Sequence, residues 1–105
     1  MEKKVQYKVI ISDRARQMLA GHVQFLAQKS PAAARKAKND LMNAIRSLSI
    51  MPERFPFLTE EFIPLNKYHK MFVEKYYLVL YQIKVQTVFV DYIADCRQDY
   101  GWLVH

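Results

Sequence analysis

Hydrophobic residues follow two different periods along this chain. From Val5 to Ile11 apolar side chains occur at alternate positions, which predicts a first β-strand. From Asp13 to about Gln28, and again after Ser30, apolar residues recur at three- and four-residue intervals, which predicts two helices that each bury one stripe. Three further runs rich in β-branched and aromatic residues, Tyr68–Val73, Tyr76–Lys84 and Thr87–Asp95, are also strand-like.

Residues with strong positional preferences mark the ends of the two helices. Ser12 or Asp13 supplies an N-cap oxygen for the first helix. Ser30 followed by Pro31 indicates a second start, because serine caps well and proline at the first helical position gives up no hydrogen bond. The helices therefore form a hairpin with a very short connection. Pro52 ends the second helix, and the apolar loop that follows is expected to pack over one end of the core.

Together these elements predict a single domain over residues 1–105 with an α+β fold. The closing strands are joined by about two residues each, so they form a three-stranded antiparallel meander. Both helices are expected on one face of this small curved sheet, with the other face open. The side chains expected beneath the helices are Val9, Ile11, Leu78, Leu80, and Phe89 or its neighbours.

Charge and cysteine content narrow the class of protein. Sixteen Lys and Arg against ten Asp and Glu give a formal net charge of +6, which favours an anionic partner such as nucleic acid, an acidic protein segment or a membrane surface. Cys96 is the single cysteine, so no internal disulfide framework forms. The chain shows no signal peptide and no membrane-spanning run, and we expect a cytoplasmic protein without a membrane partner.

Several chemistries find no support in the sequence. His22, His69 and His105 are far apart and none lies in a ligand-spaced pair, so no metal site is expected. The only glycines, Gly21 and Gly101, make no phosphate-binding loop, and we expect no cofactor. Cys96 at the end of a strand is interpreted as a small packing residue.

The remaining candidate is a group of basic and aromatic residues in the last third of the chain. Aromatic faces stack on bases while Lys and Arg hold phosphates, so such a group can bind single-stranded nucleic acid. Tyrosine is also a common strand residue, and lysine on short strands protects sheet edges. The group comprises Lys67, Tyr68, His69, Lys70, Lys75, Tyr76, Tyr77, Tyr81, Tyr92, Arg97, Tyr100 and Trp102.

The order and spacing of several short motifs resemble the RelE/ParE superfamily of toxins from type II toxin–antitoxin systems. The resemblance covers nearly the whole chain, and each motif alone is degenerate. It is carried by the opening strand Tyr7–Ser12, the hairpin segment Ser30–Ala34, the strand Tyr77–Tyr81 and the closing run Val90–Asp99. In this superfamily, RelE-like members cut mRNA on the ribosome without metal, whereas ParE-like members poison DNA gyrase, and a cognate antitoxin neutralises both.

The resemblance implies a site from which two cations are missing. Aligned on Tyr81, the chain has Leu78 where RelE-like toxins carry a mid-strand arginine, and His69 and Met71 where they carry paired lysines. Arg97, followed by Tyr100 or Trp102, keeps a counterpart of the C-terminal part of the site. We therefore expect a ParE-like toxin that inhibits its target, DNA gyrase, by protein–protein binding, through Lys67, Lys70, Lys75, Arg97, Tyr100 and Trp102.

Two alternatives stay open at this point. One is a metal-independent, ribosome-dependent mRNA endonuclease with His69 as base, Arg97 as phosphate clamp and Tyr81 or Tyr100 as orienting or acid group. The other is an inactivated homologue that retains only antitoxin binding. An acidic antitoxin segment could lie along the helix hairpin or add a strand to the sheet.

Overall fold

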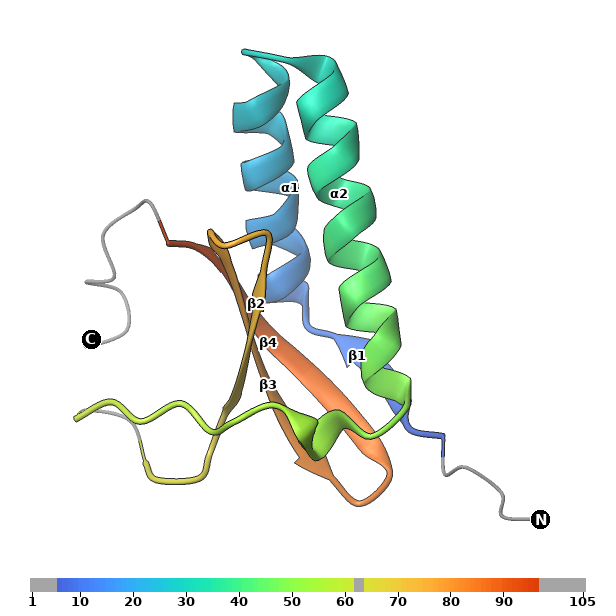
Figure 1. The fold of residues 1–105 in the computed structure, drawn as a ribbon, viewed down its shortest axis with the longest axis vertical. Helices are drawn as coiled ribbons and strands as arrows, with labels where there is room; N and C mark the ends of the chain where they lie inside the picture. Colours follow the sequence, from blue (N-terminus) through green and yellow to red (C-terminus); the bar gives the residue numbers. More distant parts are fainter. Residues whose placement is uncertain (1–5, 62–63, 97–105) are drawn as a thin grey trace.

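Strand, helix hairpin and meander follow one another as predicted in the computed structural model, which describes residues 6–61 and 64–96 (Figure 1). Two short 3₁₀ turns, η1 and η2, follow the second helix. The elements are β1 (Lys8–Ile11), α1 (Asp13–Ala27), α2 (Pro31–Arg46), η1 (Ser47–Ser49), η2 (Pro52–Arg54), β2 (His69–Val73), β3 (Tyr77–Lys84) and β4 (Thr87–Asp95).

Side-chain caps start both helices where the sequence predicts. The Ser12 hydroxyl accepts the backbone N–H of Ala15 at 3.0 Å, and the Ser30 hydroxyl accepts that of Ala33 at 3.1 Å. Each cap satisfies one of the four backbone donors that a helix N-terminus leaves without a partner. Pro31 occupies the first position of α2, where proline gives up no hydrogen bond. The two helices run as a tight hairpin along one face of the sheet (Figure 1).

The sheet has the order β1-β4-β3-β2. The three closing strands are antiparallel as predicted, while β1 pairs in parallel with β4, with Ile11 opposite Val90. The register shifts between Leu80, which pairs with Tyr92, and Tyr81, which pairs with Val90. Asp91 is thus an extra residue on β4, a β-bulge of the kind that bends a strand and increases its twist.

Beyond the end of β1, α1 takes over the edge of β4. The Ser12 hydroxyl donates to the carbonyl oxygen of Asp91 at 3.3 Å, and His22 Nε2 donates to that of Ile93 at 2.7 Å. Because buried backbone carbonyls need donors, these side chains replace the strand neighbour that β4 lacks there. The first helix is therefore joined to the sheet by hydrogen bonds as well as by packing.

The main core lies between the helices and the sheet. Residues of the α1 and α2 stripes, such as Leu19, Leu41 and Ile45, pack with Val79 and Tyr81 of β3. Val9 and Ile11 of β1 border this core and are partly buried, as expected.

The expected positions of Leu78 and Leu80 were wrong, because both belong to a second, smaller cluster with Leu58, Tyr68 and Ala94. On β4 the neighbours of Phe89, Val88 and Val90, lie in the main core, while Phe89 itself belongs to neither cluster. Alternate residues of a strand point to opposite faces, so placing Val79 and Tyr81 under the helices turns the two leucines away from them. The loop before β2 helps to cover this second face, in agreement with its predicted packing.

Candidate functional site

His69 and Tyr81 are the two predicted site residues that the structure brings together. They lie opposite each other on β2 and β3, with ring centroids 5.2 Å apart and planes inclined by 13°. Tyr81 is fully buried and His69 is 7% exposed. The ring of Phe57 covers His69 with a centroid distance of 4.1 Å. The pair, together with Phe57, therefore forms an aromatic cluster on β2 and β3.

The polar atoms of this pair hold the loop between α2 and β2. Tyr81 donates its hydroxyl hydrogen to the carbonyl oxygen of Pro52 at 2.5 Å, and burial raises the pKa of Tyr81 to about 12. His69 Nδ1 lies 2.7 Å from the carbonyl oxygen of Phe55, so Nδ1 carries a proton. In the neutral ring Nε2 is then the acceptor, which is the tautomer that a general base requires.

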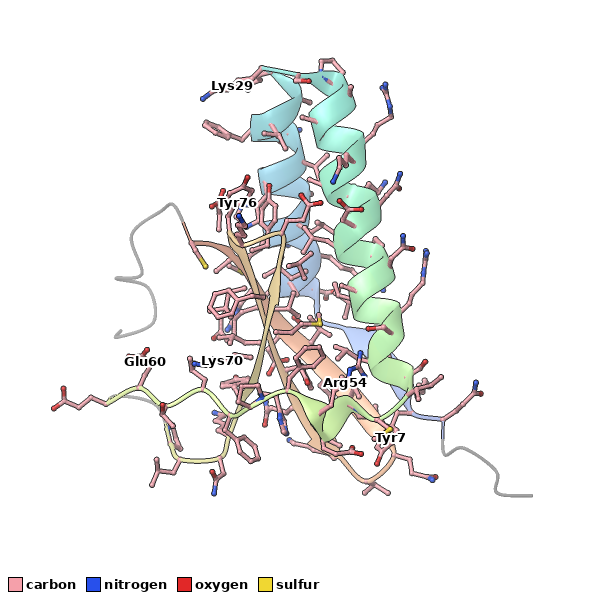
Figure 2. All side chains as sticks on the ribbon, viewed as in Figure 1. Tyr7, Lys29, Arg54, Glu60, Lys70 and Tyr76 are labelled. Atoms are coloured by element: carbon pink, nitrogen blue, oxygen red, sulfur yellow. The ribbon has the colours of Figure 1, made fainter. Side chains whose placement is uncertain are left out.

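Arg54 strengthens the same loop from the outside. Its guanidinium donates to the carbonyl oxygen of Met51 at 3.1 Å and to the hydroxyl of Ser47 at 2.9 Å. Arg54 is the last residue of η2, and Figure 2 shows it near the lower end of α2. Hydrogen bonds from Tyr81, His69 and Arg54 therefore all hold the loop between α2 and β2.

Leu78 and Met71 stand where RelE-like toxins carry cations, and both residues are buried and apolar. Leu78 is 4% exposed and Met71 is 3% exposed, and they pack in different clusters on opposite faces of the sheet. A cation would have to lose its hydration at either position, at a cost of several kcal/mol without a partner. The fold here is built around apolar side chains at the positions where the resemblance implies cations.

The basic residues predicted for target binding are spread along the outer side of β2. Lys67 precedes this strand, with its Nζ 5.4 Å from the centroid of Tyr68, and Lys70 lies on it opposite Leu80 (Figure 2). Lys75 lies in the turn after the strand, in the left-handed region with φ 73°. The other predicted residues, Arg97, Tyr100 and Trp102, lie outside the described residues.

A polar cluster joins Tyr68 and Tyr92, which the sequence placed in the basic and aromatic group, to Arg14 and Asp91, which it did not single out. Arg14 donates to the hydroxyl of Tyr92, and its guanidinium lies 4.8 Å from the centroid of that ring. Tyr68 meets Tyr92 edge to face at 5.9 Å, and burial together with the Asp91 carboxylate raises the pKa of Tyr68 to about 12. Arg14 and Tyr92 are 78 residues apart, so no local pattern announces this contact.

A groove of about 770 Å³ runs between α1 and α2. Leu19, Val23 and Met42 contribute its apolar lining, and Arg16, Lys38 and Arg46 contribute cations. None of the described residues that line it is acidic. Lys38 and Arg46 are not among the candidate residues of the sequence analysis, although the spacing Lys38, Met42, Arg46 places them on one helix face.

Neither a metal-binding cluster nor a membrane-spanning helix is present in the described ranges 6–61 and 64–96. No group of three or more His, Cys, Asp or Glu there could hold a metal ion. No helix in these ranges is long and apolar enough to cross a membrane.

The helix hairpin packed on a four-stranded sheet defines a small α+β domain, and a solved structure shares this fold. Its fold matches a solved structure described as "Chromosomal ParDE TA system from P. aeruginosa", with a TM-score of 0.70, 13% sequence identity, and coverage of 86% of this chain and 96% of that chain. A search of curated proteins found no match.

Residues 9–100 match the family described as "ParE toxin of type II toxin-antitoxin system, parDE". The chain therefore belongs to the ParE toxin family and to the wider RelE/ParE superfamily, as the sequence motifs indicated. It is a type II toxin by family, and a cognate antitoxin is the partner that this class implies.

Proposed function

We propose that this toxin inhibits DNA gyrase by protein–protein binding and that its cognate antitoxin neutralises it. The observation that carries this proposal is the buried, apolar character of Leu78 and Met71. Metal-free RNA cleavage needs cations that stabilise charge on the transferring phosphate. Neither position can present one to a bound RNA, so inhibition by binding is the better supported activity.

The proposed contact surface combines the basic residues around β2 with the C-terminal segment. Lys67, Lys70 and Lys75 supply positive charge, and Arg97, Tyr100 and Trp102 supply the residue types that most often dominate binding energy at interfaces. The net charge of +6 favours a target surface with negative charge.

A supercoiling assay with purified gyrase, relaxed plasmid and ATP tests the proposal directly. We expect the wild-type protein to inhibit supercoiling without ribosomes and Arg97→Ala to inhibit it at least tenfold less. Lys84→Ala, which removes one charge from the far β3–β4 turn, is the matched control and should retain inhibition. Absence of inhibition at stoichiometric excess of the wild-type protein would overturn the proposal.

One observation keeps the nuclease as a second candidate. The Phe55 carbonyl holds His69 in the tautomer whose Nε2 accepts a proton, as a general base must. Primer extension on translated mRNA after induction tests this candidate. Ribosome-dependent cuts that disappear in His69→Gln and Arg97→Ala would establish it, provided that both variants show wild-type melting temperatures.

The third candidate, an inactivated homologue, gives a different result in cells. Expression of this toxin without an antitoxin should stop growth if either activity is present. Normal growth with soluble, folded protein would favour a chain that retains antitoxin binding alone.

A further inference from the structure

The face of the sheet opposite the helices is covered over only part of its area. Both helices lie on one side of the sheet (Figure 1), and the loop before β2 packs on the other side over Leu78 and Leu80. Phe89 of β4 lies on this open face outside both clusters, opposite Ile10 of β1 and Gln82 of β3. Ile10 is 36% exposed and Phe89 is half-buried. The fold thus leaves an aromatic ring in the middle of the sheet outside its cores.

Basic side chains lie beside the aromatic rings of this face. Lys84 Nζ is 6.0 Å from the centroid of Phe89. Lys8 and Lys84 flank the open face on either side of β4, because both pair with the same residue of that strand. Beyond the end of β1, Arg14 donates to the hydroxyl of Tyr92, and its guanidinium lies 4.8 Å from the centroid of that ring. Each of these two rings of β4 therefore has a cation beside it.

Ion pairs do not compensate this positive charge within the part of the chain that the structure describes. The ion pairs there all involve Lys36, which contacts Asp40 and Glu74 on the other side of the molecule from this face. Asp91 is the acidic residue at the bulge of β4, and its carboxylate accepts a hydrogen bond from the neutral amide of Gln82 at 2.7 Å. The cations of the open face are therefore available to an anionic partner.

Cations beside aromatic rings fit a single-stranded nucleic acid. Each nucleotide carries a base that stacks on a ring or on a guanidinium plane and a phosphate that pairs with Lys or Arg. An acidic peptide would pair with the cations but would bring no planar group to Phe89. A duplex would use the cations alone, because its base faces are hidden within its own stack.

The spacing of the two rings also favours a single strand. Phe89 and Tyr92 are three residues apart across the bulge, so their positions on β4 are about 7–10 Å apart. Neighbouring bases in a duplex strand are only about 3.4 Å apart along the helix axis. Bases placed at these two rings must therefore be unstacked from each other, as they are on other four-stranded sheets that bind single strands.

The surroundings of Phe89 favour DNA over RNA. Ile10 is apolar, and the amide of Gln82 already donates to Asp91. A ribose 2′-hydroxyl beside Phe89 would lose water without gaining a hydrogen-bond partner, a cost that deoxyribose avoids.

We propose that the open face binds single-stranded DNA, with one base stacked on Phe89, another on the guanidinium of Arg14 over Tyr92, and phosphates beside Lys8 and Lys84. This site uses β1, β4 and β3, whereas the basic residues proposed to contact gyrase lie around β2. DNA binding therefore goes beyond the proposed function and does not depend on it.

A fluorescein-labelled oligothymidine of about 12 nucleotides is the probe, and fluorescence anisotropy measures its binding to the full-length wild-type protein. We expect saturable binding that weakens as salt rises, because bound cations are released from the phosphates. A duplex of the same length should bind about tenfold more weakly, since it offers no free base faces. The matching oligouridine should bind about threefold more weakly, since its 2′-hydroxyls find no partner.

Phe89 and Phe25 form a matched pair for testing the stacking contact. Phe89→Ala should weaken binding about tenfold. Phe25 is 51% exposed near the end of α1 and has Lys29 Nζ 4.9 Å from its centroid, so it makes the same kind of contact far from the open face. Figure 2 shows Lys29 at the tip of the helix hairpin. Phe25→Ala should leave binding unchanged. Phe89→Leu keeps an apolar side chain without a ring and should also weaken binding, which provides a second measurement if alanine impairs folding.

Charge changes test the phosphate contacts. Lys8→Glu should weaken binding about three- to tenfold, because it replaces attraction by repulsion. Lys29→Glu makes the same change in charge at the hairpin tip and should leave binding nearly unchanged. Asp91→Asn removes a negative charge from the open face and keeps an acceptor for Gln82, so it should strengthen binding about two- to threefold. Impaired folding would not produce such a gain.

Four results would overturn the proposal. The first is equal affinity of the wild-type protein and Phe89→Ala, and the second is equal loss in Lys8→Glu and Lys29→Glu. The third is a duplex or a polyglutamate peptide that binds as tightly as oligothymidine, which would reduce the site to a charged surface. The fourth is tighter binding of oligouridine, which would make the site an RNA site.

These outcomes are separable from those of the supercoiling assay, because oligonucleotide binding is measured without gyrase. Gyrase inhibition without oligothymidine binding would refute the DNA site alone. Oligothymidine binding without inhibition would refute the gyrase target alone.

Discussion

Tyr81 donates its hydroxyl hydrogen to the carbonyl oxygen of Pro52, 29 residues earlier in the chain, at 2.5 Å. This bond ties the middle of the sheet to the turn that follows α2. Tyr81 also stacks on His69, whose ring holds Phe55 in the same loop. Tyr81 and His69, the candidate acid and base of the sequence analysis, therefore have a structural role. This role gives a first prediction.

Replacing Tyr81 by phenylalanine should lower the free energy of unfolding by about 1–2 kcal/mol, because the Pro52 carbonyl loses its donor in a buried site. Urea denaturation followed by circular dichroism measures the change. Tyr7→Phe is the control, because the Tyr7 hydroxyl has no hydrogen bond among the described residues and its loss should cost much less. Equal losses in the two variants would contradict the structural role of Tyr81.

Stability should also fall at high pH. Burial raises the pKa of Tyr81 and of Tyr68 from 10.0 to about 12, and the Asp91 carboxylate adds to the effect at Tyr68. Below pH 10 both phenols keep their protons in the folded and the unfolded chain. From pH 10 to about 12 the unfolded chain loses protons that the folded chain retains, so the free energy of unfolding decreases.

Urea denaturation across this pH range checks the prediction. Lys36 contributes to the same decline, because its hydrogen bonds to Asp40 and Glu74 raise its pKa as well. The tyrosine contribution is therefore read from the difference between the wild-type protein and the variant Tyr68→Phe, which should decline less steeply. Parallel curves for the two proteins would contradict the assignment.

Val85 in the β3–β4 turn should be a site of local strain. It has φ 57° and is 94% exposed, an arrangement that β-branched residues rarely adopt. Val85→Asn should raise the free energy of unfolding by about 0.5–1 kcal/mol, because asparagine tolerates the left-handed region. Val85→Ala, which removes the branch but keeps a Cβ, should gain less, and thermal denaturation distinguishes the two. A loss of stability in Val85→Asn would show that the strain is absent.

His22 should stabilise the edge of β4. Its replacement by leucine leaves the Ile93 carbonyl without a donor, at an expected cost of about 1–2 kcal/mol. Glutamine at the same position keeps an N–H donor, so His22→Gln should recover part of the loss. The comparison uses denaturant unfolding, with amide hydrogen exchange along β4 as the local readout. Unchanged exchange in His22→Leu would show that the His22 hydrogen bond does not stabilise this edge.

The structure confirms the local elements that the sequence predicted, because each has a local cause. Ser12 and Ser30 start helices through hydrogen bonds only three residues away, and the short turns around Lys75 and Val85 force antiparallel neighbours. The resemblance in the closing strands was likewise a matter of order and spacing, and the family match over residues 9–100 bears it out.

The face that β3 turns toward the helices could not be predicted from the local sequence pattern. Every residue from Tyr77 to Tyr81 is buried. No alternation of polar and apolar positions therefore indicates which face of β3 lies under the helices. Leucine seemed the natural choice for the core. Tyr81 lies on the helix side of the sheet, where its hydroxyl donates to the carbonyl oxygen of Pro52, 29 residues earlier in the chain. A contact over that separation lies outside any local stretch of sequence.

The sequence by itself determined the order of the elements and the antiparallel meander, because caps, turns and periodicity act over a few residues. It also indicated the superfamily, through the order and spacing of short motifs. Only the tertiary structure decided that β1 lies parallel to β4, that His69 and Tyr81 stack, and that Arg16 joins Lys38 and Arg46 around one groove. Such juxtapositions arise when distant segments pack, and the free energy of that packing depends on the whole core rather than on any local stretch of chain.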